Sequence, residues 1–378
     1  MFYLKSLLLI SVVISLFTGC AQKTIEKSDI SKADLQKVNW QDIQGFEEDN
    51  LDKALEVFKK DCKSSKKYKN LSDACLKAEV STDGKYFFKT NFTPYKLMSE
   101  AEDIGLITGY YEPLLQGSLT KTGRYRYPIY SVPKDLINVD LSEAYPSLKK
   151  YRLRGKLVGN ILIPYDTRKD IENKKNKDNN LLQAICYVDD KIDLFFLHIQ
   201  GSGKIQLQDK TMLNVGYAEQ NGRKYYAVGR KLIEMGVVKK EDMSLQAIRK
   251  WLKKNPSKID EILQLNESYI FFRKSTKGAT GSLGTQLVEN RNLAVDREII
   301  PLGFPIFINT TNPLNNKEIN QLMVAADTGG AIKGKIRADF FFGHGKQAEE
   351  LAGKMKQDGK LYMFIPNNIA KDSIYSKK

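Results

Sequence analysis

Short apolar runs broken by Gly, Pro and Asn fill the chain from Ile104 to Val215. Runs of this length between turn residues are typical of β-strands. They include KIDLFFLHIQGSGKIQL, Lys191–Leu207, which we expect to be extended. Strands are expected again over Tyr269–Arg273 and through the apolar segments near the C-terminus. The pattern predicts a mainly β protein with a few helices, closer to a pair of barrels than to a parallel α/β sheet.

A helical spacing of apolar residues interrupts the strand pattern in a few places. It predicts helices over Asp49–Ser64, Tyr225–Met235, Ser244–Lys254 and Lys346–Met355. The first has an apolar face made of Leu51, Leu55, Phe58 and Cys62, and the third begins at a suitable N-cap, Ser244. A chain of 378 residues is long enough for two domains, each with its own core.

The N-terminus resembles a bacterial export signal. The apolar run Leu7–Phe17 has the length of a signal-peptide core and is short for a membrane span. Gly19 and Cys20 then resemble a lipobox, with an ordinary signal peptide and a chance cysteine as the alternative. We therefore expect residues 1–19 to be a signal peptide and Cys20 to carry the lipid anchor. Ala21 favours the periplasmic side of the outer membrane.

Export places the mature chain in an oxidising compartment. Cys62 and Cys75 are close in sequence, and we expect a disulfide between them. Cys186 lies in the apolar run LLQAICYV and is expected to be a buried thiol. With His198 and His344 as the only histidines, no zinc cluster can form at normal spacing. The sequence therefore predicts neither a metal site nor a cofactor.

The chain is strongly basic, with 60 Lys and Arg against 45 Asp and Glu and a net charge of +15. A solvated, lysine-rich surface accounts for this charge in most proteins. Attraction to a polyanion is the alternative, and export argues for an anionic wall polymer and against nucleic acid.

Three aspartates lie inside strand-like apolar runs near the C-terminus: Asp296 in LAVDREIIPLG, Asp327 in LMVAADTGGAIKG and Asp339 in IRADFFFG. A carboxylate in such a run either finds hydrogen-bond partners or has a raised pKa. A raised pKa keeps the group protonated near neutral pH, as a general acid requires. These residues are therefore the first candidates for catalysis.

Strand alternation separates Asp339 from the core side of its run. Ala338 and Phe340 point to one face, whereas Arg337, Asp339 and Phe341 point to the other. Asp339 is thus expected to share a face with an arginine and an aromatic ring.

Asp327 and Asp296 also have structural interpretations. Asp327 precedes Thr-Gly-Gly, and an aspartate there can accept backbone N–H groups in a turn. The DTG triplet is also found in aspartic proteases, but those enzymes need two such carboxylates and this chain has one DTG. A dimer could supply the second copy, so the protease remains a minor alternative.

Two further segments carry groups suited to binding sugars. In TGYYEP, adjacent tyrosines point to opposite faces of a strand, so that one can stack on a sugar while the other packs inward. In LHIQGSG, strand alternation places Gln200 and Ser202 on one face, and the glycines allow close approach of a ligand. The candidate binding residues are Thr108, Gly109, Tyr110, Tyr111, Gln200, Gly201 and Ser202.

A series of motifs, in this order, resembles the membrane-bound lytic murein transglycosylase A family. The motifs are GYYEP, FFLHIQGSG, VGYAEQNGRKYYAVGR, SLQAIRKWL, GSLGTQLVENRNLAVDREIIPLG and DTGGAIKGKIRADFFFGHG. The likeness extends from Gly105 to Pro366, with Asn292 where the family often has serine. It implies a double-psi β-barrel from residues 20–112 and 270–378. Residues 113–269 would form an inserted β-barrel-like domain, with a glycan groove between the two.

The resemblance implies cleavage of the β-1,4 bond between N-acetylmuramic acid and N-acetylglucosamine in peptidoglycan, forming 1,6-anhydromuramyl ends. It assigns catalysis to Asp339 and support to Asp327 and Asp296. One carboxyl group suffices if the C6 hydroxyl of the sugar is the nucleophile. A hydrolytic muramidase would need a second carboxylate, for which Glu112 is the candidate. A non-catalytic peptidoglycan-binding lipoprotein is the other alternative.

The expected partners follow from this assignment. They are peptidoglycan glycan strands, the membrane through the N-terminal lipid, and cell-wall remodelling proteins. The chain itself is expected to be a monomer.

Overall fold

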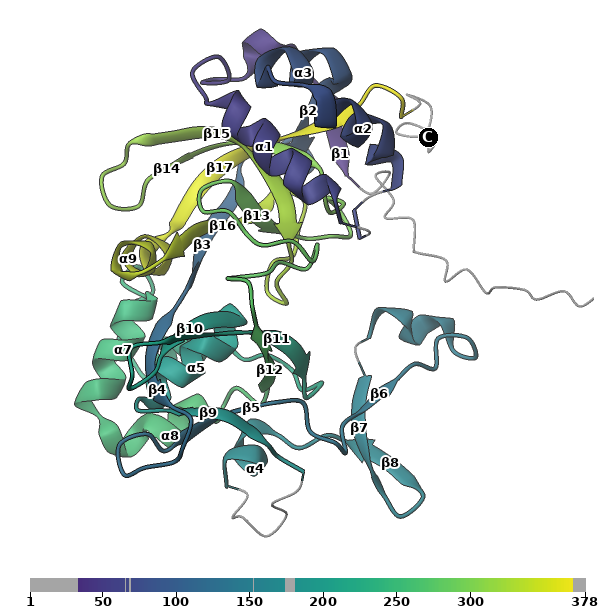
Figure 1. The fold of residues 1–378 in the computed structure, drawn as a ribbon. Helices are drawn as coiled ribbons and strands as arrows, with labels where there is room; N and C mark the ends of the chain where they lie inside the picture. Colours follow the sequence, from purple (N-terminus) through teal and green to yellow (C-terminus); the bar gives the residue numbers. More distant parts are fainter. Residues whose placement is uncertain (1–32, 65, 68, 152, 174–180, 370–378) are drawn as a thin grey trace, which may run out of the picture.

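The computed structural model describes residues 33–64, 66–67, 69–151, 153–173 and 181–369. The predicted signal peptide and Cys20 lie outside these residues. The described chain is mainly β and forms two bodies, each built around its own sheet (Figure 1). None of the helices in the described ranges has the length and apolarity needed to cross a membrane.

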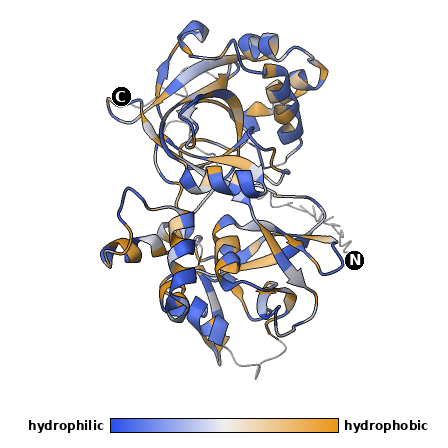
Figure 2. Cartoon of the chain, turned by 90° about the vertical axis from the view of Figure 1, so that its left-hand side faces the viewer, coloured by the Kyte–Doolittle hydropathy of each residue, from blue (hydrophilic) through white to orange (hydrophobic). Residues whose placement is uncertain are grey.

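The first body is a closed barrel, seen as a ring in Figure 2. Its strands pair in the order β17-β14-β15-β13-β16-β3, and β3 pairs back onto β17, so the sheet closes. The strands are β3 Gly105–Glu112, β13 Asn292–Val295, β14 Pro305–Thr311, β15 Glu318–Asp327, β16 Arg337–His344 and β17 Lys356–Pro366. Two more strands extend it beyond β17: β2 Phe92–Met98 and β1 Asp34–Lys37. Its interior is the largest apolar cluster of the chain.

The barrel body also contains four helices: α1 Leu51–Cys62, α2 Ser72–Val80, α3 Gly84–Asn91 and α9 Lys346–Lys354. Asn50 caps α1 by accepting a 2.9 Å hydrogen bond from the Lys53 backbone. A disulfide between Cys62 and Cys75 joins α1 to α2, so the expected pairing is confirmed. Neither α2 nor α3 was expected from the sequence, because α2 has no clear apolar stripe and α3 has only 8 residues.

The second body contains β4 Leu114–Ser118, β5 Tyr127–Tyr130, β9 Ala184–Val188, β10 Ser202–Gln206, β11 Met212–Gln220 and β12 Ile270–Ser275. They form one sheet in the order β12-β11-β10-β4-β9-β5, and its end strands approach each other, so the sheet curls toward a barrel. Its helices are α4 Arg168–Asn173, α5 Lys191–Gln200, α6 Val228–Glu234, α7 Leu245–Lys254 and α8 Ile259–Leu263. Ser244 caps α7 as expected, accepting from the Ala247 backbone.

A small third sheet projects from this body (Figure 1). It consists of β6 Ile137–Val139, β7 Leu153–Val158 and β8 Ile161–Pro164. Short 3-10 turns occupy Trp40–Asp42, Lys69–Leu71, Pro146–Lys150 and Pro256–Lys258.

The prediction of an extended segment over Lys191–Leu207 was wrong for its first half, which is helix α5. Asp190 caps this helix by accepting hydrogen bonds from two backbone N–H groups, and Gly201 ends it at φ +78°. The helix is buried on opposite sides, with Leu194 and Leu197 against the second sheet and Phe195 against the helices. A helix that is apolar all round shows no periodicity, so its sequence looked like a buried strand.

The expected return to the barrel at residue 270 also needs correction. β12 pairs with β11 in the second sheet, so residues 270–275 belong to that body. At the other crossing, β3 ends at Glu112 in the barrel and β4 begins at Leu114 in the second sheet. A short apolar strand carries no signal that distinguishes one sheet from another.

Candidate active site

Two of the three aspartates lie in one row across the barrel. Asp327 on β15 pairs in register with Ala294 on β13, which pairs on its other side with Asp339 on β16. Asp339 in turn pairs with Thr108 on β3. Since neighbouring strands are about 4.8 Å apart, the backbones of the two aspartates are roughly 10 Å apart, with a small residue between them.

Strand alternation at Asp339 is as predicted. Ala338 and Phe340 join the barrel core, whereas Phe341 packs with Tyr110 in a separate cluster at a ring distance of 5.0 Å. Asp339 is therefore held on the face away from the main core, on a strand fixed from behind by apolar packing.

The Asp339 carboxyl group is partly buried and has one short hydrogen bond. Thr108 Oγ1 donates to its Oδ1 at 2.6 Å. Burial raises the pKa of Asp339 to about 6, and the negative charge of Asp327 adds to this effect. The hydrogen bond from Thr108 and the positive charge of Arg337 act in the opposite direction. The result is a carboxyl group that can be protonated or ionised near neutral pH.

Arg337 orients the threonine. Its Nη2 donates to Thr108 Oγ1 at 2.8 Å, and its Nη1 donates to the Ala338 carbonyl at 2.5 Å. Because the Thr108 oxygen accepts from Arg337, its own hydrogen is directed to Asp339. The sequence placed Arg337 on this face but gave no sign that it acts through a threonine from a distant strand.

Asp327 is held by a loop that the sequence analysis did not assign to the site. Its Oδ1 accepts hydrogen bonds from Ser282 N at 2.8 Å, Ser282 Oγ at 2.9 Å and Thr328 N at 2.8 Å. Burial raises the pKa of Asp327, and these donors oppose the rise. Ser282 lies in the motif GSLGTQ, but nothing local to that motif indicates contact with Asp327.

Asp296 performs a turn-forming role next to the site. Its Oδ1 accepts from Lys333 Nζ at 3.0 Å and from the Glu298 backbone at 3.2 Å, and its Oδ2 accepts from Gly334 N at 3.2 Å. The carboxylate thus ties the end of β13 to the segment that leads into β16. Its hydrogen-bond partners are Lys333, Glu298 and Gly334, and Asp339 is not among them.

The two tyrosines of GYYEP point to opposite faces of β3, as predicted. Tyr111 belongs to the barrel core, and Tyr110 is only 9% exposed, in the cluster with Phe341. The expectation that one ring is free to stack on a sugar is therefore wrong, because apolar neighbours cover both. A Cβ at Gly109 would lie 2.6 Å from the Phe342 ring, so this glycine permits close packing behind the site.

Gln200 and Ser202 are not neighbours on one strand face, because the former ends α5 and the latter begins β10. Gln200 Oε1 accepts a 3.1 Å hydrogen bond from Tyr111 N on β3. This contact brings the second body to the strand that carries Thr108. Gly201, Gln200 and Ser202 all remain partly exposed.

Glu112 is the other buried carboxyl group on β3. It is only 4% exposed, its Oε2 lies 3.6 Å from Lys204 Nζ, and burial raises its pKa. Glu112 is four residues along the strand from Thr108, or roughly 13 Å.

A buried polar cluster behind the site was not predicted. Asp61 on α1, only 1% exposed, accepts from Thr285 Oγ1 at 2.6 Å and from Asn292 Nδ2 at 2.9 Å. Ser64 also donates to the Leu283 carbonyl. The end of α1 therefore holds both the loop that carries Ser282 and the start of β13.

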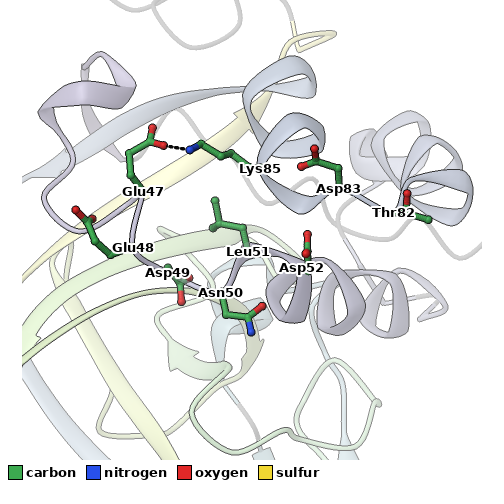
Figure 3. Close-up of a pocket in the computed structure, with 9 residues that line it drawn as sticks. All are labelled: Glu47, Glu48, Asp49, Asn50, Leu51, Asp52, Thr82, Asp83 and Lys85. Carbon is green, nitrogen blue, oxygen red and sulfur yellow. Dashed lines mark ion pairs between the residues drawn. The ribbon is translucent and has the colours of Figure 1, made fainter.

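A separate pocket lies between the N-terminal ends of α1 and α3 (Figure 3). None of the predicted site residues lines it. Three of its acidic residues have structural partners: Asp49 pairs with Arg291 at 2.8 Å, Asp52 accepts from Gly84 N at 2.7 Å, and Glu47 pairs with Lys89 at 2.5 Å. Carboxylates at helix N-termini are stabilised by the helix dipole, so this pocket needs no ligand to explain it.

A family model described as the MltA specific insert domain matches residues 106–273, and the 3D domain model matches residues 291–365. Membrane-bound lytic murein transglycosylase A of Escherichia coli (strain K12) is 34% identical over 276 residues, covering 70% of this chain and 67% of the relative.

Solved structures agree with these matches. The membrane-bound lytic murein transglycosylase from Agrobacterium tumefaciens has a TM-score of 0.80 at 29% identity, covering 90% of this chain and 99% of that chain. Escherichia coli MltA with bound chitohexaose has a TM-score of 0.66 at 27% identity, covering 84% and 90%. The expected fold, a double-psi β-barrel with a second domain, is thereby confirmed. The chain belongs to the membrane-bound lytic murein transglycosylase A family.

Proposed function

We propose that this chain is a lytic transglycosylase of peptidoglycan in which Asp339 is the single catalytic acid and base. The observation that carries this assignment is the environment of Asp339. The group is partly exposed, has a pKa raised to about 6, and has one donor that stabilises its ionised form. Such a group can release a proton in the first step and accept one in the second.

In the first step, the Asp339 carboxyl group donates its proton to the glycosidic oxygen. The bond between this oxygen and C1 of N-acetylmuramic acid breaks, and N-acetylglucosamine leaves with a free hydroxyl. In the second step, the Asp339 carboxylate takes the proton of the C6 hydroxyl while O6 bonds to C1. The product is a 1,6-anhydromuramyl end, Asp339 is protonated again, and no water is consumed.

The partners of the other carboxyl groups favour one catalytic residue over two. Asp327 Oδ1 already accepts three hydrogen bonds, and Asp296 is engaged with Lys333 and a turn. Glu112 is buried, and Lys204 lies beside its carboxyl group. We assign support of the site to Asp327 and Asp296, the former also through its charge, which raises the pKa of Asp339.

A glycan strand is the proposed ligand. The Escherichia coli structure with bound chitohexaose shows that a relative with this fold binds a β-1,4-linked sugar chain. In this chain we assign sugar contacts to Thr108, the backbone at Gly109, Gln200, Gly201 and Ser202, from the two bodies. The buried rings of Tyr110 and Tyr111 support this surface from behind.

We also propose that the two bodies are separate domains with the glycan groove between them. The barrel domain would end at Glu112 and resume after Ser275. The curated relatives are membrane-bound, and a lipid on Cys20 is the proposed anchor of this chain, on the periplasmic side of the outer membrane. A monomer that contacts other cell-wall remodelling proteins fits this location.

The test is mass spectrometry of purified peptidoglycan digested by the wild type and by Asp339→Asn. We expect anhydro ends, lighter by one water than reducing ends, from the wild type and no cleavage by the variant. Asp209→Asn, in an exposed turn where Asp209 accepts from Thr211, is the matched control and should remain active. Reducing ends from the wild type would indicate a hydrolase, and a wild type that binds glycan without cleaving it would indicate a binding lipoprotein.

A further inference from the structure

The β7–β8 hairpin ends in an apolar tip, which we define as Leu157, Val158, Ile161 and Leu162. Their exposed fractions are 58%, 55%, 63% and 43%. The turn between the strands is Gly159-Asn160, with Gly159 at φ +60°. Four large aliphatic side chains at the end of one hairpin form a concentrated exposed apolar surface.

Both faces of the tip are apolar. Leu157 lies opposite Leu162 in the register, and Val158 lies opposite Ile161, so each pair occupies its own face of the hairpin. A hairpin that packs on a protein core is apolar on one face and polar on the other. Apolar side chains on both faces suit a medium that surrounds the tip from all sides.

The base of the hairpin is fixed to the second body. Arg154 Nη2 donates to both carboxylate oxygens of Glu219, at 3.0 and 3.1 Å, and Lys156 pairs with Asp166. A Cβ at Gly222 would lie 2.8 Å from the Arg154 Cβ, so the backbones are closely packed there. The tip is therefore presented in a defined position, away from the rest of the body (Figure 1).

The segment that carries the tip is basic in sequence, although Arg154 and Lys156 are paired with Glu219 and Asp166. From Ala144 to Tyr165 the sequence has five basic residues (Lys149, Lys150, Arg152, Arg154 and Lys156) and no Asp or Glu. A basic segment next to an apolar one is the usual composition of peptides that lie in the interface of an anionic bilayer. A glycan strand is a poor partner for four aliphatic side chains, because they cannot form hydrogen bonds with its hydroxyl groups.

We propose that this tip inserts into the surface of an anionic lipid bilayer and forms a second membrane contact beside the predicted lipid anchor. From Cys20 to Ala33, the first described residue, the chain advances 33 − 20 = 13 residues and spans at most about 45 Å. An anchor of this reach keeps the protein at the bilayer surface, where a weak contact made by the hairpin is strengthened by its high local concentration. This second contact would restrict the orientation of the face that carries Asp339 relative to the cell wall.

The proposal is tested with the mature chain from Ala21, which lacks the lipid and keeps every described residue. Flotation is measured with vesicles of phosphatidylglycerol and phosphatidylethanolamine, and with phosphatidylcholine alone. We expect binding to the anionic vesicles, and a reduction of at least about tenfold in Leu157→Ser/Ile161→Ser, which changes one side chain on each face. Cleavage of soluble glycan by this variant should remain at the wild-type rate, which shows that it is folded.

The matched control is Val80→Ser/Leu119→Ser, which changes two exposed aliphatic residues outside the tip, at 85% and 57% exposure. It should float like the wild type. A reporter variant, Asn160→Trp, should show a blue shift of its fluorescence on adding anionic vesicles. The proposal would be overturned if the wild type does not bind to anionic vesicles, if the tip variant binds as well as the wild type, or if the reporter fluorescence does not shift. A tip that binds only another protein would leave the wild type unbound to vesicles. Because these assays use vesicles, their outcome is independent of the glycan-cleavage test.

Discussion

Thr108 Oγ1 donates a 2.6 Å hydrogen bond to Asp339 Oδ1 and accepts a 2.8 Å hydrogen bond from Arg337 Nη2. The three residues form a chain in which a guanidinium fixes a hydroxyl and the hydroxyl stabilises a carboxylate. Burial raises the pKa of Asp339, and this chain limits the rise, so that the group titrates at about 6. The strength of Asp339 as an acid is therefore set by residues of two strands.

Replacing Thr108 by Val removes the donor to the ionised Asp339. The pKa of Asp339 should then rise by about one unit, because the hydrogen bond favours the charged form. The reaction needs protonated Asp339 at the start, so kcat/KM should fall on the alkaline side at about pH 6 in the wild type. In Thr108→Val this alkaline limb should move to higher pH, as measured by a pH profile of soluble glycan cleavage.

Thr108→Ser is the control for this experiment because it keeps the hydroxyl group. Its alkaline limb should coincide with that of the wild type. An unchanged limb in Thr108→Val would show that the hydrogen bond does not set the acidity of Asp339.

Asp339→Asn should abolish cleavage and yet stabilise the fold at pH 7.5. The pKa of Asp339 is raised from 3.8 to about 6 in the folded state, so its ionisation opposes folding above this range. A shift of roughly two units corresponds to about 3 kcal/mol, which partial solvent exposure reduces to about 1–2 kcal/mol.

The pH dependence of this gain follows from the sign of the shift. Below pH 3.8, Asp339 is protonated in both the folded and the unfolded state, so its contribution to folding is fully retained. This stability is lost as pH rises through about 6, the pKa of Asp339 in the folded state. The difference in free energy of unfolding between variant and wild type, measured in urea, should thus be smaller at pH 4 than at pH 7.5. An equal or larger gain at pH 4 would contradict the assigned pKa shift.

Asn292→Ala should destabilise the barrel by about 1–3 kcal/mol, because it leaves the buried carboxyl group of Asp61 without one of its donors. Asn292 Nδ2 lies 2.9 Å from Asp61 Oδ2, and Asp61 is 1% exposed. Urea unfolding gives the free energy directly. Asn320→Ala, which removes an amide from the partly exposed end of β15, should cost clearly less, and equal losses would argue against the buried cluster.

Removing the disulfide by Cys62→Ser/Cys75→Ser should lower the free energy of unfolding by about 3 kcal/mol, as expected for a short closed loop. The sequence separation of the two cysteines is 13. Because Cys62 follows Asp61, we also expect the end of α1 to loosen. Thermal unfolding followed by circular dichroism provides the measurement. The wild type under reducing conditions should behave like the variant, and a stability equal to that of the oxidised wild type would show that the bridge contributes nothing.

Cys20→Ala should release the protein from membranes or leave it weakly bound, since stable anchoring requires the lipid. The measurement is the share of the protein in membrane fractions after a high-salt wash. Cys186→Ala, which removes a buried thiol outside the predicted lipobox, is the control and should remain in the membrane fraction. Full membrane retention of Cys20→Ala would contradict the predicted lipidation.

Local sequence patterns predicted the parts of the site that depend on one strand. Alternation placed Asp339 with Arg337 and Phe341, away from Ala338 and Phe340, because the pleat repeats every two residues regardless of the neighbouring strand. The cap at Ser244 was predicted for the same reason, since a cap satisfies backbone groups within one turn.

Patterns without periodicity were misinterpreted. The apolar run of α5 reads as a buried strand, and only its packing between the second sheet and the helices distinguishes the two. The sequence also suggested a free tyrosine ring at the site. Burial of Tyr110 and Tyr111 depends on α9 and β16, which come from the other end of the chain.

The sequence alone determined that the chain carries a carboxyl group on the non-core face of an apolar strand, in a motif order shared with one family. Tertiary structure decided what that carboxyl group meets. Thr108 is 231 residues from Asp339 in sequence, and Ser282 is 45 residues from Asp327. Pairing of β3 with β16 brings Thr108 to Asp339, and packing of the loop that carries Ser282 against the end of β15 brings Ser282 to Asp327. The acidity of Asp339 is thus a property of the barrel, whereas its orientation is a property of its own strand.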